Sequence, residues 1–212
     1  MTDPRALRGL LFDKDGTLFG FQATWSGWAC DLVHELVEGD AARAAGLADV
    51  LRLDLAERLF LPDSPLIAGT EADALELMLP HLPGLGEGEL LRRLASSAAT
   101  IVPVEAVPLA PLMARLRAAG YVLGVATNDG EEAALRQLER CALGGAFDVV
   151  AGYDSGHGGK PAPGQCLAFA EETGLDPSRV AMIGDSTHEL EAGRAAGMVI
   201  ERWWEEYLAP QH

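Results

Sequence analysis

Four short apolar segments, each ending abruptly in a polar loop, constrain the fold of this chain more than any other feature. They cover residues 9–12, 121–125, 147–150 and 179–183. Apolar runs of this length are typical of parallel strands that are buried on both faces. Stretches with helical periodicity separate them, at residues 111–119, 131–142, 163–173 and 187–196. The alternation predicts an α/β protein with a doubly wound parallel sheet under helices on both faces.

Residues 21–101 interrupt this alternation. They contain several amphipathic stretches and no convincing strand, with expected helices at 25–38, 41–47, 53–60, 71–79 and 87–100. We therefore expect a helical domain inserted into a sheet domain that comprises residues 1–20 and 102–212. A chain of 212 residues has room for both domains and for no third one.

The charge balance limits the partners of the chain. Acidic residues outnumber basic ones by 32 to 16, which gives a net charge of -16. The summed field repels nucleic acid and anionic membrane surfaces, so we expect neither as a partner. The chain shows no apolar run of membrane-spanning length and no signal-peptide pattern. These features predict a cytoplasmic protein. A small anionic substrate remains possible, because a metal ion and a few cationic groups can set the local field of a cleft. The oligomeric state stays open between monomer and homodimer.

Three carboxylates follow the expected strands. Asp13 and Asp15 come directly after the first strand, and Asp185 comes after the last. In sheets of this kind ligands bind outside the carboxyl ends of the strands, so these side chains should meet in one crevice. Carboxylate oxygens suit Mg2+. Asp13 is placed to bind the metal with one oxygen and to attack phosphorus with the other, which predicts an aspartyl-phosphate intermediate.

Four short motifs in order resemble those of the haloacid dehalogenase superfamily of phosphohydrolases. They are Asp13-Lys14-Asp15-Gly16-Thr17-Leu18, Thr127-Asn128, Lys160-Pro161 and Gly184-Asp185-Ser186. The resemblance covers essentially the whole sheet domain, and the inserted segment is similar to that family's helical cap. It implies a Rossmann-like core and places the chain near the phosphoglycolate phosphatase branch. Four motifs in the expected order are far more specific than any one alone.

The resemblance also implies individual roles. Asp15 would give its backbone carbonyl to the metal and its side chain to proton transfer, first as general acid and then as general base. Metal ligands would be Asp13, Asp15 and Asp185. The phosphoryl oxygens would be bound by Thr127, Asn128 and Lys160.

The chain has two lysines, Lys14 and Lys160, among its 16 basic residues. Both lie in the motifs, which strengthens the assignment of Lys160. We expect Lys14 to point away from the site, because alternate strand positions face apart.

The fourth motif departs from the common family pattern. Many relatives carry a second aspartate where this chain has Glu189, and the longer side chain predicts action through a water or another protein group. Ser186 belongs to the same outer set. Candidate substrate contacts are Gln22, Trp25 and His157, although core packing or local hydrogen bonding is the simpler interpretation of each. The pair at 203–204, two tryptophans, is expected to cover a sheet edge or to contact a second subunit.

These observations predict a Mg2+-dependent phosphatase of small phosphomonoesters similar to phosphoglycolate. The cap has no lysine to form an imine, which argues against a phosphonatase, and a haloacid dehalogenase has no use for Asp15. A phosphomutase of the β-phosphoglucomutase type shares the same core, so this alternative stays open. A catalytically silent binding or regulatory module on the same scaffold is a second alternative, against which the intact motif residues argue.

Overall fold

A computed structural model of the chain describes residues 6–202. The chain divides into two compact units. The sheet unit contains the residues up to Phe19 and from Glu105 onward, and the cap unit is Gly20–Val104. The boundaries expected from the sequence lie within three residues of these. The tryptophans at 203–204 fall outside the described residues.

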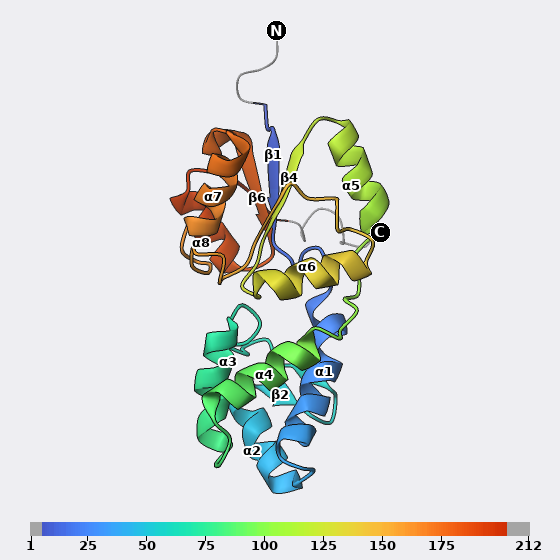
Figure 1. The fold of residues 1–212 in the computed structure, drawn as a ribbon, viewed down its shortest axis with the longest axis vertical. Coiled ribbons are helices and arrows are strands. Elements are labelled where there is room, and N and C mark those ends of the chain that lie inside the picture. The colour runs from blue at the N-terminus through green and yellow to red at the C-terminus, as the bar shows by residue number, and fades with distance from the viewer. Residues whose placement is uncertain (1–5, 203–212) are drawn as a thin grey trace. The chain divides into compact units, whose positions relative to one another are not determined.

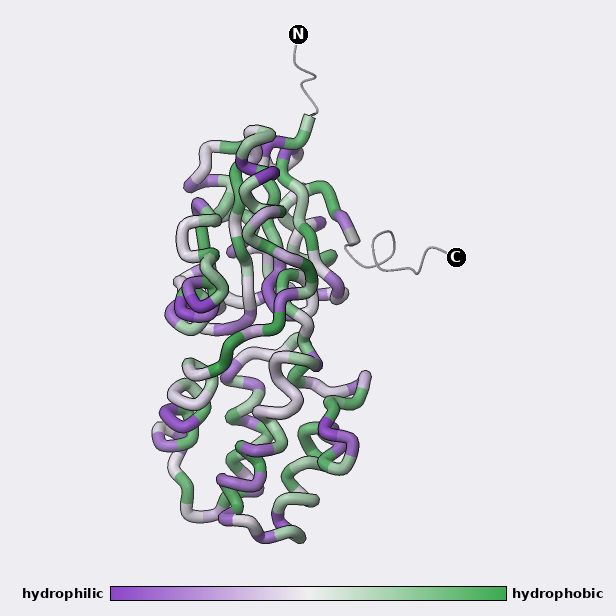
Figure 2. The backbone as a smooth tube through the Cα atoms, turned by 90° about the vertical axis from the view of Figure 1, so that its right-hand side faces the viewer, coloured by the Kyte–Doolittle hydropathy of each residue, from purple (hydrophilic) through white to green (hydrophobic). Residues whose placement is uncertain are grey.

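The sheet unit is built on five parallel strands in the order β5-β4-β1-β6-β7. The tube in Figure 2 alternates between hydrophobic stretches, in green, and hydrophilic stretches, in purple. Four of the strands correspond to the four apolar segments of the sequence. The fifth, β7, was not predicted, because its short apolar run leads into no polar motif. The strands are β1 (Gly9–Phe12), β4 (Val122–Ala126), β5 (Val149–Ala151), β6 (Val180–Gly184) and β7 (Val199–Arg202).

Helices cover both faces of this sheet, as the alternating pattern predicted (Figure 1). Leu10 and Phe12 of β1 share one apolar cluster with residues of α5 and α6. Leu11 between them belongs to the opposite cluster, with residues of α7 and α8. This period of two is the ordinary geometry of a strand buried on both faces. The helices are α5 (Leu109–Ala118), α6 (Glu131–Arg140), α7 (Gly164–Thr173), the short 3-10 helix η2 (Pro177–Arg179) and α8 (Thr187–Ala195).

The cap unit is predominantly helical and has an apolar core of its own, centred on residues such as Val33, Leu47 and Leu90. The start of α2 is capped by Asp40, whose carboxylate accepts the backbone N–H groups of two residues in the first turn. A side-chain cap of this kind satisfies donors that have no partner within the helix. The helices are α1 (Phe21–Leu36), α2 (Ala41–Leu51), α3 (Glu71–Met78), the 3-10 helix η1 (Leu79–His81) and α4 (Glu87–Ala98).

The expectation of a helix at 53–60, and of no strand in the cap, is wrong. This segment forms an antiparallel hairpin of two very short strands, β2 (Leu53–Asp54) and β3 (Leu59–Phe60). Helix α2 ends at Leu51, and the backbone of the next residue, Arg52, is left-handed with φ 54°. The Asp54 carboxylate then accepts two backbone N–H groups of the turn, at 2.9 and 3.0 Å. Such local bonds favour a turn over a continuing helix.

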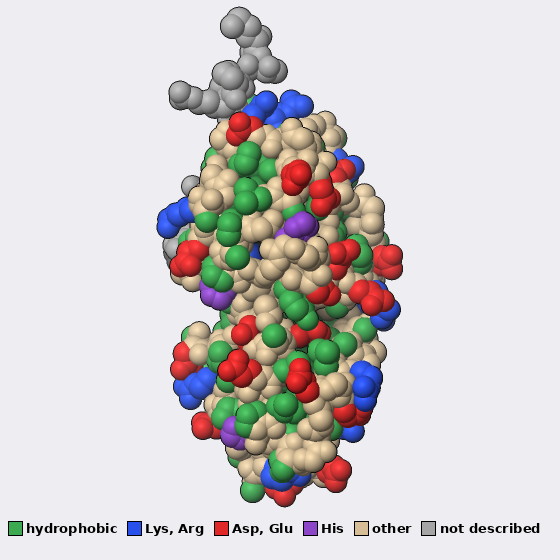
Figure 3. Space-filling view, turned by 60° about the vertical axis from the view of Figure 1, so that its left-hand side comes forward, with side chains coloured by type: hydrophobic (Ala, Val, Ile, Leu, Met, Phe, Trp, Pro, Cys, Tyr) green, Lys and Arg blue, Asp and Glu red, His purple; other side chains and the backbone are tan. Residues whose placement is uncertain are grey.

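The surface agrees with the acidic composition. The face shown in Figure 3 carries more Asp and Glu than Lys and Arg side chains. Within residues 6–202, no helix combines the length and the apolar character needed to cross a bilayer.

Candidate active site

The central position of β1 brings the motifs together. It pairs with β4 on one side and β6 on the other, so the loops that follow these three strands are neighbours. Asp13 donates its backbone N–H to the carbonyl of Ile183 at 2.8 Å. Gly16 has a left-handed backbone, with φ +99°, and a Cβ there would lie 2.4 Å from an oxygen of the Asp185 carboxylate. The first and fourth motifs are therefore in direct contact, as the sequence predicted.

The Asp13 carboxylate is held by Lys160. One oxygen, Oδ1, forms an ion pair with the ammonium of Lys160, and both side chains are almost completely buried. Burial raises the pKa of Asp13 to about 7, with Lys160 opposing this shift and Glu189 and Asp185 adding to it. Burial alone would lower the pKa of Lys160, but Asp13 and Glu189 raise it above its ordinary value. Lys160 is thus a fixed positive charge beside the expected nucleophile.

Glu189 reaches this site through Lys160. Its Oε1 lies 2.8 Å from the ammonium, while Oε2 accepts the backbone N–H of Ser186 at 2.9 Å and also its hydroxyl. Ser186 and Glu189 form a capping box at the start of α8. Burial raises the pKa of Glu189, but Lys160 and the hydrogen bonds lower it by a larger amount. The pKa of Glu189 is therefore below its ordinary value. The sequence predicted that Glu189 acts through a water or another protein group. In the structure its carboxylate contacts Lys160.

The side chain of Asn128 forms hydrogen bonds with the backbone of Lys160. Its side-chain amide donates to the carbonyl of Lys160 at 3.0 Å and accepts the backbone N–H of Lys160 at 2.8 Å. Thr127 is buried, and its hydroxyl oxygen accepts the backbone N–H of Asp129 at 3.1 Å. The carbonyl of Thr127 accepts the side chain of Gln165 at 2.8 Å. The second motif therefore lies at the site, but the Asn128 amide, expected to bind phosphate, is engaged with the backbone of Lys160.

The alternation of strand positions predicted that Lys14 points away from the site, and this prediction is wrong because Lys14 pairs with Asp15. The Lys14 side chain is completely buried and forms ion pairs with Asp15 and, at 2.9 Å, with Asp129. It also donates to Gln137 Oε1 at 2.6 Å. Burial alone would lower the pKa of Lys14, yet Asp129 and Asp15 raise it above its ordinary value. That both lysines of the chain lie in the motifs was a signal that applied to Lys14 as much as to Lys160.

The residues at the strand ends fit a magnesium ion. Among the described residues no three His, Cys, Asp or Glu side chains form a ready metal cluster, and the Asp15 carboxylate is engaged by Lys14. Asp13 Oδ2, however, is buried without a hydrogen-bond partner. Burial and the nearby Glu189 raise the pKa of Asp185 to about 6. Two such carboxylates, with waters completing the shell, match the preference of Mg2+ for few protein ligands.

The candidate substrate contacts are placed differently. The Gln22 amide pairs with the backbone of Phe60, donating at 2.9 Å and accepting at 3.0 Å. Trp25 lies in the apolar core of the cap unit, 8% exposed. A substrate role for either would require these contacts to break. His157 is exposed in the loop before Lys160.

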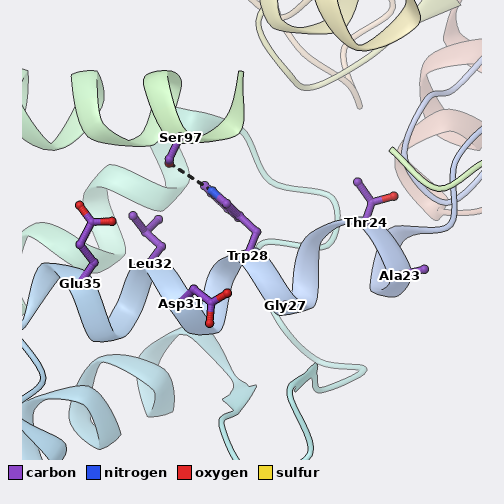
Figure 4. Close-up of a pocket in the computed structure, with 8 residues that line it drawn as sticks. All are labelled: Ala23, Thr24, Gly27, Trp28, Asp31, Leu32, Glu35 and Ser97. Carbon is purple, nitrogen blue, oxygen red and sulfur yellow. Dashed lines mark hydrogen bonds between the residues drawn. The ribbon is translucent and has the colours of Figure 1, made fainter. Parts of the chain in front are cut away.

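The cap unit has a pocket of about 460 Å³ between α1 and α4 (Figure 4). The Trp28 indole in its wall donates to the hydroxyl of Ser97 at 3.1 Å. The pocket contains none of the three candidate substrate contacts. Its lining consists of Ala23, Thr24, Gly27, Trp28, Asp31, Leu32, Glu35 and Ser97.

Comparison with known proteins agrees with this geometry. The family of haloacid dehalogenase-like hydrolases matches residues 7–197. An N-acetylmuramic acid 6-phosphate phosphatase from Pseudomonas aeruginosa is 30% identical over 193 residues, which cover 90% of this chain and 79% of the relative. A phosphoglycolate phosphatase from Escherichia coli is 34% identical over 89 residues, which cover 42% of this chain and only 35% of the relative.

A solved structure, described as a predicted phosphoglycolate phosphatase from Haemophilus somnus, superposes with a TM-score of 0.65 at 18% identity. It covers 93% of this chain and 88% of the other, and it supports the fold. The family match spans both the four motifs and the inserted cap. The chain therefore belongs to the haloacid dehalogenase-like hydrolases, and its relatives from P. aeruginosa and E. coli are named phosphatases.

Proposed function

We propose that the protein is a Mg2+-dependent phosphatase that hydrolyses small phosphomonoesters through an aspartyl-phosphate at Asp13. The observation that carries this proposal is the state of the Asp13 carboxylate. One of its oxygens is paired with Lys160, and the other is buried without a hydrogen-bond partner. A carboxylate of this kind is oriented by one oxygen and keeps the other for a metal ion or for phosphorus.

Asp13 attacks phosphorus, so that a bond forms between its oxygen and phosphorus while the ester P–O bond breaks. Asp15 gives its proton to the departing oxygen. In the second half-reaction Asp15 takes a proton from the water that attacks the phosphoryl group, which releases phosphate and restores Asp13. Lys160 stabilises negative charge on the phosphoryl oxygens, and Thr127 lies at the neighbouring strand end.

Magnesium, bound by Asp13, by Asp185 and by the backbone carbonyl of Asp15, would supply positive charge that offsets the repulsion between carboxylate and phosphate. The raised pKa values of Asp13 and Asp185 support this assignment. Carboxylates that are costly to ionise alone gain most from a cation.

We propose a small phosphorylated acid as the substrate. The relative from P. aeruginosa is named for N-acetylmuramic acid 6-phosphate and the one from E. coli for phosphoglycolate. Both names describe a phosphate ester of an organic acid. The expected cytoplasmic location, and the absence of nucleic-acid and membrane partners, remain predictions.

Release of inorganic phosphate tests this function. The panel contains phosphoglycolate, N-acetylmuramic acid 6-phosphate, a neutral sugar phosphate and p-nitrophenyl phosphate, each with Mg2+ or with EDTA. We expect Mg2+-dependent release that is strongest for the acids and absent from a folded Asp13→Asn variant. No release above that variant would favour a silent binding module. Isomerisation of a sugar phosphate with little free phosphate would instead identify a phosphomutase.

A further inference from the structure

Each of the two aspartates of the first motif pairs with one of the two lysines of the chain. Lys160 pairs with Asp13, and Lys14 pairs with Asp15. The alternation of β1, continued past its end at Phe12, places Lys14 and Asp13 on opposite sides. Phe12 contributes to the cluster with α5 and α6, and two positions on, the Lys14 side chain meets Gln137 of α6. Asp13, one position on, faces the other way, toward Lys160.

The Lys14 ammonium is surrounded by acidic and amide side chains. It contacts the Asp15 carboxylate, Asp129 Oδ2 at 2.9 Å and Gln137 Oε1 at 2.6 Å. The lysine is fully buried, whereas the Asp15 and Asp129 side chains are 14% and 28% exposed. The ammonium is thus fixed to α6 and to the loop before it, and it also pairs with Asp15, which is partly exposed.

Packing alone does not explain a lysine at this position. Burying an ammonium costs free energy that its ion pairs recover only with good geometry, and an apolar side chain of similar volume often serves the fold as well. The chain uses lysine nowhere outside its motifs. The charge at Lys14 therefore points to a requirement of one of its partners, and Asp15 is the partner that lies in the first motif.

We propose that Lys14 is the positioning residue of Asp15, fixing where that carboxyl group stands when it exchanges a proton with the leaving group. This inference rests on the phosphatase function proposed above. Asp15 transfers the proton to the ester oxygen as the bond to phosphorus breaks, and Lys14 keeps its own protons throughout. A proton donor must lie within hydrogen-bond reach of its target, and small displacements have large effects on rate.

Leaving-group dependence distinguishes this role from a structural one. A phosphate ester of an alcohol needs protonation of the departing oxygen, whereas p-nitrophenolate departs readily without it. The ratio kcat/KM reports the steps up to the first irreversible one, here departure of the leaving group. We therefore compare kcat/KM for an alkyl phosphate and for p-nitrophenyl phosphate in the wild type and in Lys14→Met.

We expect Lys14→Met to lower kcat/KM for the alkyl ester by about tenfold or more beyond its effect on the aryl ester, since a general acid contributes on the order of 10²–10⁴. Asp15→Asn should shift the ratio in the same direction and further. Arg117→Met is the matched control, because it removes a cation paired with Asp148 at 3.0 Å in the same unit. This control should leave the ratio of the two substrates unchanged.

An equal loss on both substrates, in Lys14→Met shown to be folded by circular dichroism, overturns the proposal. Should that variant not fold, Lys14→Gln keeps a polar donor at the position, and the same criterion applies to it. A wild-type protein that releases no Asp13-dependent phosphate from either ester refutes the phosphatase function itself. An active wild type with equal losses refutes only the role of Lys14.

Discussion

Asp13 makes the metal-free protein sensitive to pH in a direction opposite to that of a typical carboxylate. Its pKa is raised from 3.8 to about 7 in the folded protein, mainly by burial. Below pH 3.8 the carboxyl group is protonated in both the folded and the unfolded state, and its burial then carries no penalty for a charge. The folded protein is therefore most stable, as far as Asp13 is concerned, in this pH range. As the pH rises, the unfolded chain releases the proton first. Stability is therefore lost progressively until the pH passes the folded pKa.

The magnitude follows from the shift. A difference of about three pKa units corresponds to about 4 kcal/mol, of which about 2–3 kcal/mol is lost between pH 5 and pH 8. Asp13→Asn removes the titrating group and keeps the shape of the side chain. We expect the free energy of unfolding of the wild type to fall by that amount relative to the variant over this pH interval, in EDTA at constant ionic strength.

Urea unfolding followed by circular dichroism measures this difference, and hydrogen exchange of the β1 amides localises it to the sheet unit. Saturating Mg2+ at pH 8 should restore the stability of the wild type and have little effect on the variant, since a ligand stabilises the state that binds it. Parallel pH profiles for the two proteins would refute the reasoning that Asp13 is buried at an energetic cost which a cation relieves.

Two further substitutions test groups at the site, and a third tests the stability of the cap unit. Glu189→Gln should lower kcat/KM about 10–100-fold and cost about 1–3 kcal/mol, because Lys160 loses its second counter-charge; unchanged steady-state kinetics would contradict this. Gly16→Ala places a methyl group against Asp185 and should weaken Mg2+ binding about tenfold or more, as measured by calorimetric titration. Asp40→Ala removes the cap of α2 and should cost about 1 kcal/mol in urea unfolding without changing kcat/KM.

Much of the fold was readable from local pattern. The apolar segments that end in polar motifs became β1, β4, β5 and β6, because a strand buried on both faces needs apolar residues throughout. The hairpin of the cap was not readable in this way. Its leucines have a spacing that suits a helix, and the left-handed Arg52 and the turn bonds of Asp54 outweigh that pattern.

The site was predictable as a set of residues but not as a network. Motif order placed Asp13, Lys160 and Asp185 together. The alternation of strand positions predicted that Lys14 points away from the site, whereas its ammonium pairs with Asp15. Pattern alone could not show what Lys14 would meet there. Asp129 and Gln137 are more than 100 residues away along the chain, so their approach depends on tertiary packing of α6 against the sheet.

Trapping the covalent intermediate tests the central claim most directly. The enzyme, Mg2+ and the best substrate of the panel are mixed, quenched in acid within one turnover and digested for mass spectrometry. The account predicts a transient phosphoryl group on Asp13, absent from Asp13→Asn and from samples in EDTA. Phosphate release at an undiminished rate by the Asp13→Asn variant, without phosphorylation of Asp13 in the wild type at any time, would contradict it.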